Sequence, residues 1–108
     1  MARKIAAMVI LAVALIFAQN PAEAAEVHVG NYSDGTAVYI LTESVSIKGR
    51  NPYSFTCRVR AGQDYLGYSF FPYNGSPYYR NSEGYEGYVN GGVSPVAANI
   101  YRYVLKNW

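Results

Sequence analysis

The sequence predicts a small exported α+β domain, in which one C-terminal amphipathic helix packs on a face of a small antiparallel β-sheet. Three observations lead to this fold class. Short segments with strand-like alternation are separated by turns rich in Gly, Asn and Asp. The last segment changes to helical periodicity. Hydrophobic residues make up 51% of the 108 residues and charged residues 15%, a composition typical of a folded domain rather than a disordered chain.

The first 24 residues have the features of a secretory signal peptide. Two basic residues precede an uncharged, mostly aliphatic run at 5–17. This run is too short for a membrane anchor, because a spanning helix needs about 20 apolar residues. The small residues at positions 22 and 24 match those that a signal peptidase reads, so we expect cleavage after Ala24. Cleavage after Ala25 is the alternative.

Residues 25–108 then form a single mature domain, secreted or periplasmic and without a membrane partner after cleavage. The Ala-rich signal is of bacterial type, and no Cys follows it directly for lipid attachment. Cys57 is the only cysteine, so no intramolecular disulfide can form and stability must come from packing. The formal net charge of +2 is too small a bias to indicate a nucleic-acid partner.

The first strands follow from alternation and turn chemistry. Residues 27–30 alternate apolar and polar side chains, and Asp34-Gly35 after them favours a turn. Residues 36–41 are apolar on both faces, as expected of a central strand. Val45 and Ile47 either extend this strand or form a short partner.

Two further strands are predicted in the middle of the chain. Residues 53–60 show the cleanest alternation, with Cys57 on the apolar face. Residues 65–71 follow after a turn, and 72–77 form a loop or hairpin tip around Asn74-Gly75. In this strand one side carries Leu66, Tyr68 and Phe70, and the other carries Tyr65, Ser69 and Phe71.

The segment after this tip is harder to assign. Residues 78–80 and 85–89 predict short edge strands separated by a turn at 81–84. The many glycines equally describe an ordered loop pinned by tyrosines.

The chain closes with a helix. Ser94 is a good N-cap and Pro95 suits the first helical position, so we expect a helix from there to about Asn107. One broad face of it is apolar, made of Val96, Ala97, Ile100, Tyr101, Tyr103, Val104, Leu105 and Trp108.

Side chains that carry catalysis are sparse. His28 is the only histidine and lies on the solvated face of the first strand, without a neighbouring ligand or nucleophile. Cys57 should be a buried neutral thiol, although pairing between chains is an alternative. Glu83 and Glu86 invite a paired-acid interpretation, but glycan hydrolysis needs a deep cleft. The chain has no G-x-S-x-G, no Walker loop and no Cys-x-x-Cys. We therefore expect no enzyme, no metal site and no cofactor.

The unusual feature is a segment rich in tyrosine. Aromatic residues are 16% of the chain, and residues 65–88 hold seven of the twelve Tyr. Rigid amphipathic rings among Asn, Ser and Gly are typical of binding surfaces, but the rings equally could be cross-strand pairs that stabilise the domain. If they form a surface, its partner is a protein or glycan at the cell envelope or host surface. The candidate binding residues are Tyr73, Asn74, Tyr78, Tyr79, Arg80, Tyr85 and Tyr88.

Two other functions stay open from the residues alone. A periplasmic inhibitor or accessory protein of an envelope enzyme needs a rigid protruding loop, for which Asn74-Gly75 and 81–84 are candidates. A small enzyme needs a cleft that unites carboxylates or His28.

The order of segments also resembles a known group. A signal peptide followed by VHVGNYSDGTAVYILTESVSIKG, FTCRVRA, YLGYSFFPY and a closing amphipathic helix resembles the small exported bacterial proteins grouped with surface-adhesin protein E. The resemblance implies an antiparallel sheet with a C-terminal helix and a role in adhesion. It assigns no residue here, because the segments of the adhesin that bind host matrix proteins have no match in this chain.

Overall fold

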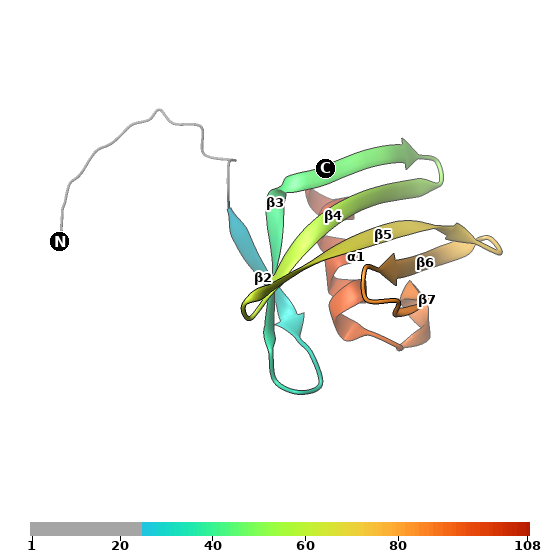
Figure 1. The fold of residues 1–108 in the computed structure, drawn as a ribbon. Coiled ribbons are helices and arrows are strands. Elements are labelled where there is room, and N and C mark those ends of the chain that lie inside the picture. Colours follow the sequence, from blue (N-terminus) through green and yellow to red (C-terminus); the bar gives the residue numbers. More distant parts are fainter. Residues whose placement is uncertain (1–24) are drawn as a thin grey trace, which may run out of the picture.

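The computed structural model describes residues 25–108, so the expected signal peptide, including Ala24, lies outside the described residues. The described chain forms a six-stranded antiparallel sheet and one C-terminal helix (Figure 1). The predicted α+β class is confirmed at this level, with the sheet as the larger part. In chain order, the elements are β2 (Glu26–Asn31), β3 (Ala37–Arg50), β4 (Tyr53–Ala61), β5 (Asp64–Tyr73), β6 (Ser76–Asn81), β7 (Glu86–Tyr88), the 3-10 turn η2 (Val89–Gly91) and α1 (Pro95–Asn107). Between residues 25 and 108 no helix has the length and apolar character to cross a membrane.

The strands pair in sequence order, so the sheet is a meander of hairpins. β3 is one continuous strand, which settles the position of Val45 and Ile47 as its extension. Its pairing with β4 shifts register between Leu41 and Ser46. Ser44 lies at this irregularity: its Oγ donates to the Leu41 carbonyl at 2.6 Å and accepts from the Arg58 N–H at 2.8 Å. The Ser44 hydroxyl thus replaces backbone hydrogen bonds that are missing between β3 and β4 at the register shift, and β3 bends there (Figure 1).

The second half of the sheet corrects one prediction. Residues 78–80 do not form an edge strand, because β6 lies between β5 and β7. The edge is β7, after which η2 replaces the rest of the expected strand at 85–89. The tip between β5 and β6 is a tight two-residue turn with positive φ at Asn74 (52°) and Gly75 (81°), residue types that tolerate this conformation.

The core lies between the inner face of the sheet and α1. Ser94 caps the helix, since its Oγ accepts from the Ala97 N–H at 3.1 Å, and Pro95 is the first helical residue as predicted. The helix buries Val96, Ala97, Ile100 and Val104 against strand residues such as Val38, Ile40, Phe55, Val59, Tyr68 and Phe70. On the flank, Tyr101 stacks over Phe55 with ring centroids 6.1 Å apart.

The apolar face of the helix is narrower than the sequence predicted. Leu105 and Trp108 are exposed, because the sheet covers only one side of the helix. Trp108 instead contacts the ring of Tyr103 at 5.9 Å, and its carbonyl oxygen accepts from Arg50 Nη1 at 3.0 Å.

Candidate binding surface

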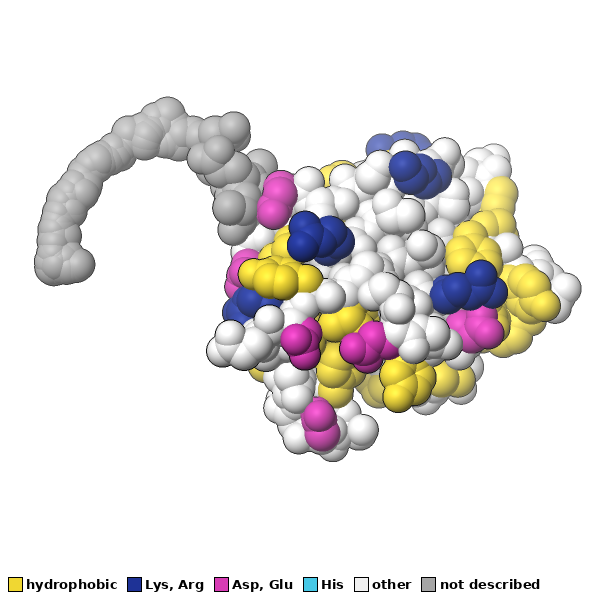
Figure 2. Space-filling model, viewed as in Figure 1, with side chains coloured by type: hydrophobic (Ala, Val, Ile, Leu, Met, Phe, Trp, Pro, Cys, Tyr) yellow, Lys and Arg dark blue, Asp and Glu magenta, His cyan; other side chains and the backbone are white. Residues whose placement is uncertain are grey.

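Strand alternation places a second set of side chains on the outer face of the sheet, which no element of residues 25–108 covers. Figure 2 views this face. Uncharged polar groups and backbone, drawn white, occupy much of its middle, and hydrophobic and basic side chains gather to either side.

One end of the outer face carries four aromatic rings in mutual contact, which we call the outer aromatic patch: Phe71, Tyr73, Tyr78 and Tyr88. Phe71 and Tyr78 are direct partners across β5 and β6, and Tyr78 and Tyr88 across β6 and β7. The Tyr78 ring centroid lies 5.7 Å from Phe71, 4.7 Å from Tyr73 and 5.0 Å from Tyr88. Tyr73 is 50% exposed and Tyr88 36%, so the patch faces solvent.

One hydrogen bond links the patch to the hairpin tip. Asn74, at the tip of the β5–β6 hairpin, donates from Nδ2 to the Tyr88 hydroxyl at 3.1 Å. This bond ties the hairpin tip to the edge strand β7.

Desolvation, with a smaller contribution from the nearby Glu86 carboxylate, raises the pKa of Tyr78. Its hydroxyl therefore stays neutral at physiological pH, able to donate and accept hydrogen bonds.

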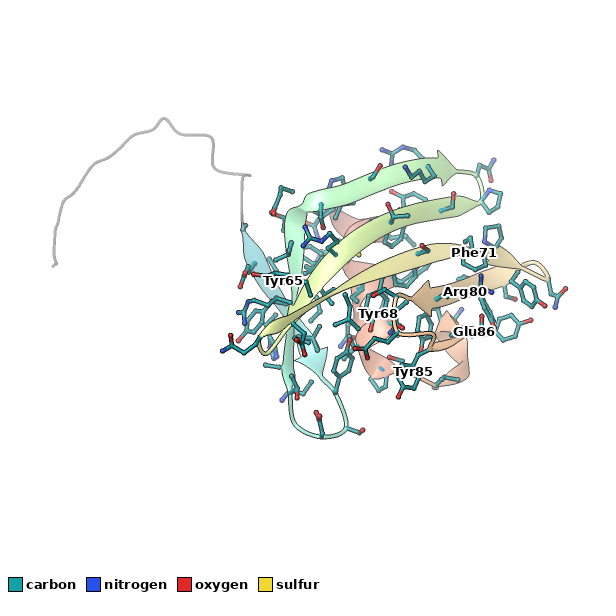
Figure 3. The ribbon with its side chains drawn as sticks, in the orientation of Figure 1. Tyr65, Tyr68, Phe71, Arg80, Tyr85 and Glu86 are labelled. Atoms are coloured by element: carbon teal, nitrogen blue, oxygen red, sulfur yellow. The ribbon has the colours of Figure 1, made fainter. Side chains whose placement is uncertain are left out.

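A charge pair borders the patch. Arg80 Nη2 lies 2.8 Å from Glu86 Oε1, and Arg80 Nε donates to the same oxygen at 2.9 Å. The Arg80 guanidinium also lies 5.7 Å from the centroid of the Phe71 ring. Figure 3 shows Phe71, Arg80 and Glu86 in succession across the end of the sheet. The rim is polar and nearly balanced in charge, as is common at protein interfaces.

A shallow depression of about 430 Å³ lies in the middle of the outer face, and Arg80 at the border of the patch is among its lining residues. Short side chains line it, among them Ser44, Thr56, Gly67, Ser69 and Ser82, and Arg58 and Arg80 border it. At the far end Arg58 lies over the ring of Tyr65, with 5.3 Å between guanidinium carbon and ring centroid. A floor of hydroxyl groups thus separates the outer aromatic patch from Arg58 and Tyr65.

The structure divides the predicted binding residues into three groups. Tyr73, Asn74, Tyr78, Arg80 and Tyr88 come together at the patch. Tyr85 is 65% exposed but lines a second cavity, whose walls include none of the four patch rings.

The assignment of Tyr79 to the binding surface is wrong. It is only 3% exposed, on the inner face of β6, with its ring 5.9 Å from Tyr68 and 6.3 Å from Phe70. The prediction treated 65–88 as one surface, whereas successive residues of a strand point to opposite faces. The same alternation also identifies the member that the prediction missed, because Phe71 shares the outward face with Tyr73.

Each candidate catalytic side chain has surroundings of its own. His28 is exposed on β2, where its Nε2 and Asn31 Oδ1 lie 2.8 Å apart. Cys57 is a buried free thiol, as predicted, and burial raises its pKa to about 12. Glu86 is paired with Arg80, whereas Glu83 lines the second cavity. Among residues 25–108 no three His, Cys, Asp or Glu side chains are grouped so as to hold a metal ion.

No protein-family model, curated protein or solved structure matches this chain. The resemblance to the surface-adhesin protein E group therefore stays a prediction.

Proposed function

We propose that this protein is an exported, non-catalytic binding module whose outer aromatic patch contacts a protein or glycan at the cell envelope or on a host surface. One observation carries the proposal. Four aromatic rings lie in contact with one another on a sheet face that residues 25–108 leave open. Contiguous exposed apolar surface of this kind, with a polar rim, marks interaction sites in soluble proteins.

The fold does not need these rings for its core. The buried cluster is complete on the inner face, where α1 covers the sheet, and none of the four patch residues belongs to it. Rings in such positions instead offer contact area at low entropic cost on binding, because a tyrosine has only two side-chain torsions to fix. The bond from Asn74 to the Tyr88 hydroxyl lowers that cost further for this ring, because it favours one orientation before binding.

The chemistry of the patch favours binding over catalysis. The Tyr78 hydroxyl has a raised pKa, and the Arg80 charge is largely satisfied by Glu86. Neither group is poised as a nucleophile or base at neutral pH, and the function needs no cofactor.

A second candidate is an inhibitor or accessory protein of an envelope enzyme. The observation in its favour is the β5–β6 hairpin, whose two-residue tip at Asn74-Gly75 is tight and tied to Tyr88. A stiff projection of this sort can enter an active-site cleft with little ordering cost.

Affinity capture with matched variants tests the proposal. The full chain carries a C-terminal tag and is exposed to envelope fractions, host matrix fractions and a glycan array. The double variant Tyr73→Ser/Tyr88→Ser should lose the captured partner. Tyr65→Ser is the control, because Tyr65 is 55% exposed on the same face but lies at the far end of β5. Capture that survives the double variant would contradict the proposal.

The inhibitor candidate gives a different result in the same material. It predicts that the protein lowers a hydrolytic activity of the envelope fraction and that Asn74→Ala/Gly75→Ala, which disturbs the tip, restores that activity. Adhesion predicts no change of activity.

Export is tested separately by the mass of the purified protein. We propose a secreted or periplasmic location and expect a mature chain beginning at Ala25. An intact Met1 on protein from the cytoplasm would contradict it.

A further inference from the structure

A second cavity, of about 430 Å³, has none of the four rings of the outer aromatic patch in its walls. Its walls come from the β2–β3 turn, from β5 and β6, from the β6–β7 turn and from the start of α1. The function proposed above makes no use of it.

The walls are rich in tyrosine. Tyr32, Tyr68, Tyr79 and Tyr85 all line the cavity, together with aliphatic side chains. The Tyr32 and Tyr68 hydroxyls are hydrogen-bonded at 2.7 Å. Burial, and then the bond to Tyr68, raises the pKa of Tyr32 far above its ordinary value, so this ring stays neutral. Tyr85 is 65% exposed and lies at the mouth, where Figure 3 shows it projecting from the β6–β7 side.

The charges around the cavity have one sign. Asp34 and Glu83 line it, and no Lys, Arg or His does so. Neither carboxylate forms a salt bridge within residues 25–108. Hydrogen bonds from Thr36 lower the pKa of Asp34, so that it is ionised at neutral pH, and the Glu83 charge is near enough to contribute to the raised pKa of Tyr32. The cavity therefore has a negative potential.

One buried polar group completes the site. Asn81 is 8% exposed and also lines the cavity. Its Oδ1 accepts from the Glu83 N–H at 3.0 Å and from the Tyr85 N–H at 3.1 Å, which fixes the turn that carries both residues. Its Nδ2 has no hydrogen-bond partner among the described residues. A buried amide in this state can serve a ligand oxygen.

We propose that this cavity binds a small molecule with an alkylammonium group. Of the four tyrosines, Tyr85 is exposed and Tyr32 is partly exposed, so these two rings can attract an organic cation through their quadrupoles, while the buried Tyr68 and Tyr79 form the wall behind them. Asp34 and Glu83 add direct electrostatic attraction. A neutral molecule of the same shape gains only the apolar contacts, and an anion is repelled. This site is independent of the outer aromatic patch, so either proposal can fail alone.

The test compares choline with 3,3-dimethylbutan-1-ol, its uncharged carbon analogue, as probes in NMR titrations of the full chain. Choline should bind in the millimolar range and shift signals of the cavity residues, with the neutral analogue about tenfold weaker. Equal affinities, shifts confined to other residues, or no binding of choline at all would overturn the proposal.

Two variants separate charge from folding. In Asp34→Asn/Glu83→Gln each carboxylate is replaced by an uncharged amide of the same shape, which keeps an oxygen to accept from the Thr36 N–H. This double variant should weaken choline binding about tenfold without changing the affinity of the neutral analogue. Glu43→Gln is the control, because Glu43 is exposed on β3 and does not line the cavity. An equal loss in the control would mean that net charge, rather than the site, binds the cation. Tyr73→Ser/Tyr88→Ser should leave choline binding unchanged.

Discussion

Replacing Tyr79 with Ser removes a ring that is 3% exposed and packs against Tyr68 and Phe70, whereas Tyr73→Ser removes one that is 50% exposed. Both residues belong to the tyrosine-rich segment, and they lie on opposite faces of the sheet. The structure therefore predicts very different effects on the free energy of unfolding.

The difference can be worked out from buried area. Complete burial removes about 150 to 250 Å² of a tyrosine from water, which at ~25 cal/mol per Å² is about 4 to 6 kcal/mol. Tyr79→Ser should cost most of this. Tyr73 buries at most half as much area. The contacts that Tyr73→Ser removes lie at the surface, where cross-strand pairs contribute about 0.2 to 1 kcal/mol. A domain of this length has a stability of about 4 to 13 kcal/mol, so the loss of Tyr79 alone removes between about a third and all of it.

Urea denaturation followed by far-ultraviolet circular dichroism measures the free energy of unfolding of both variants. With a slope of about 1 kcal/mol per M, Tyr73→Ser should lower the midpoint by about 1 M or less. Tyr79→Ser should lower it by about 3 to 5 M or leave the protein unfolded in buffer. Tyr79→Phe keeps the ring and should stay within about 1 kcal/mol of the parent. Similar midpoints for Tyr79→Ser and Tyr73→Ser would refute the assignment of the two faces.

Three other predictions concern single groups. The Cys57 thiol, with its pKa raised to about 12 by burial, should not react with Ellman's reagent at pH 8 until the protein is unfolded; rapid labelling of native protein would show that the inner face is open. Hydrogen bonds from Arg60 hold the pKa of Glu26 below its ordinary value of 4.5, so the stability that this pair provides is present above pH 4.5 and is lost as the pH falls through the lower pKa of the folded state. Glu26→Gln should therefore reduce the acid dependence of the unfolding midpoint below pH 4.5, and an unchanged profile would contradict this role. Ser94→Ala should cost about 1 kcal/mol in urea denaturation because it removes the helix cap, while Ser94→Thr should restore most of that; equal losses would mean that the cap bond does not stabilise the helix.

Local patterns were sufficient for much of the fold. The alternation at 53–60 and 65–71 predicts β4 and β5 and assigns their faces correctly, because strands buried on one side must alternate. Asn74-Gly75 predicts the hairpin tip, and Ser94-Pro95 predicts the start of α1 to the residue. Each of these signals depends only on residues close together in the sequence.

Other features depend on contacts between distant segments. The continuity of β3 through Ser44 rests on a bond to the Arg58 backbone, which no local pattern reports. The interior position of β6 needs a partner, β7, of only three residues. At the binding surface, counting tyrosines included Tyr79 and omitted Phe71, because composition does not record which face a side chain occupies. The second cavity was not predicted at all, since Tyr32 and Tyr68 meet across 36 positions of sequence.

The most direct test of whether the outer aromatic patch serves binding is a comparison of partner capture by three proteins at equal folded concentration. They are the parent, the control Tyr65→Ser and the double variant Tyr73→Ser/Tyr88→Ser. We expect the parent and Tyr65→Ser to capture the same envelope or host component, and the double variant to fold and capture none. A double variant that folds and still captures that component would show that the four rings are only part of the sheet's packing.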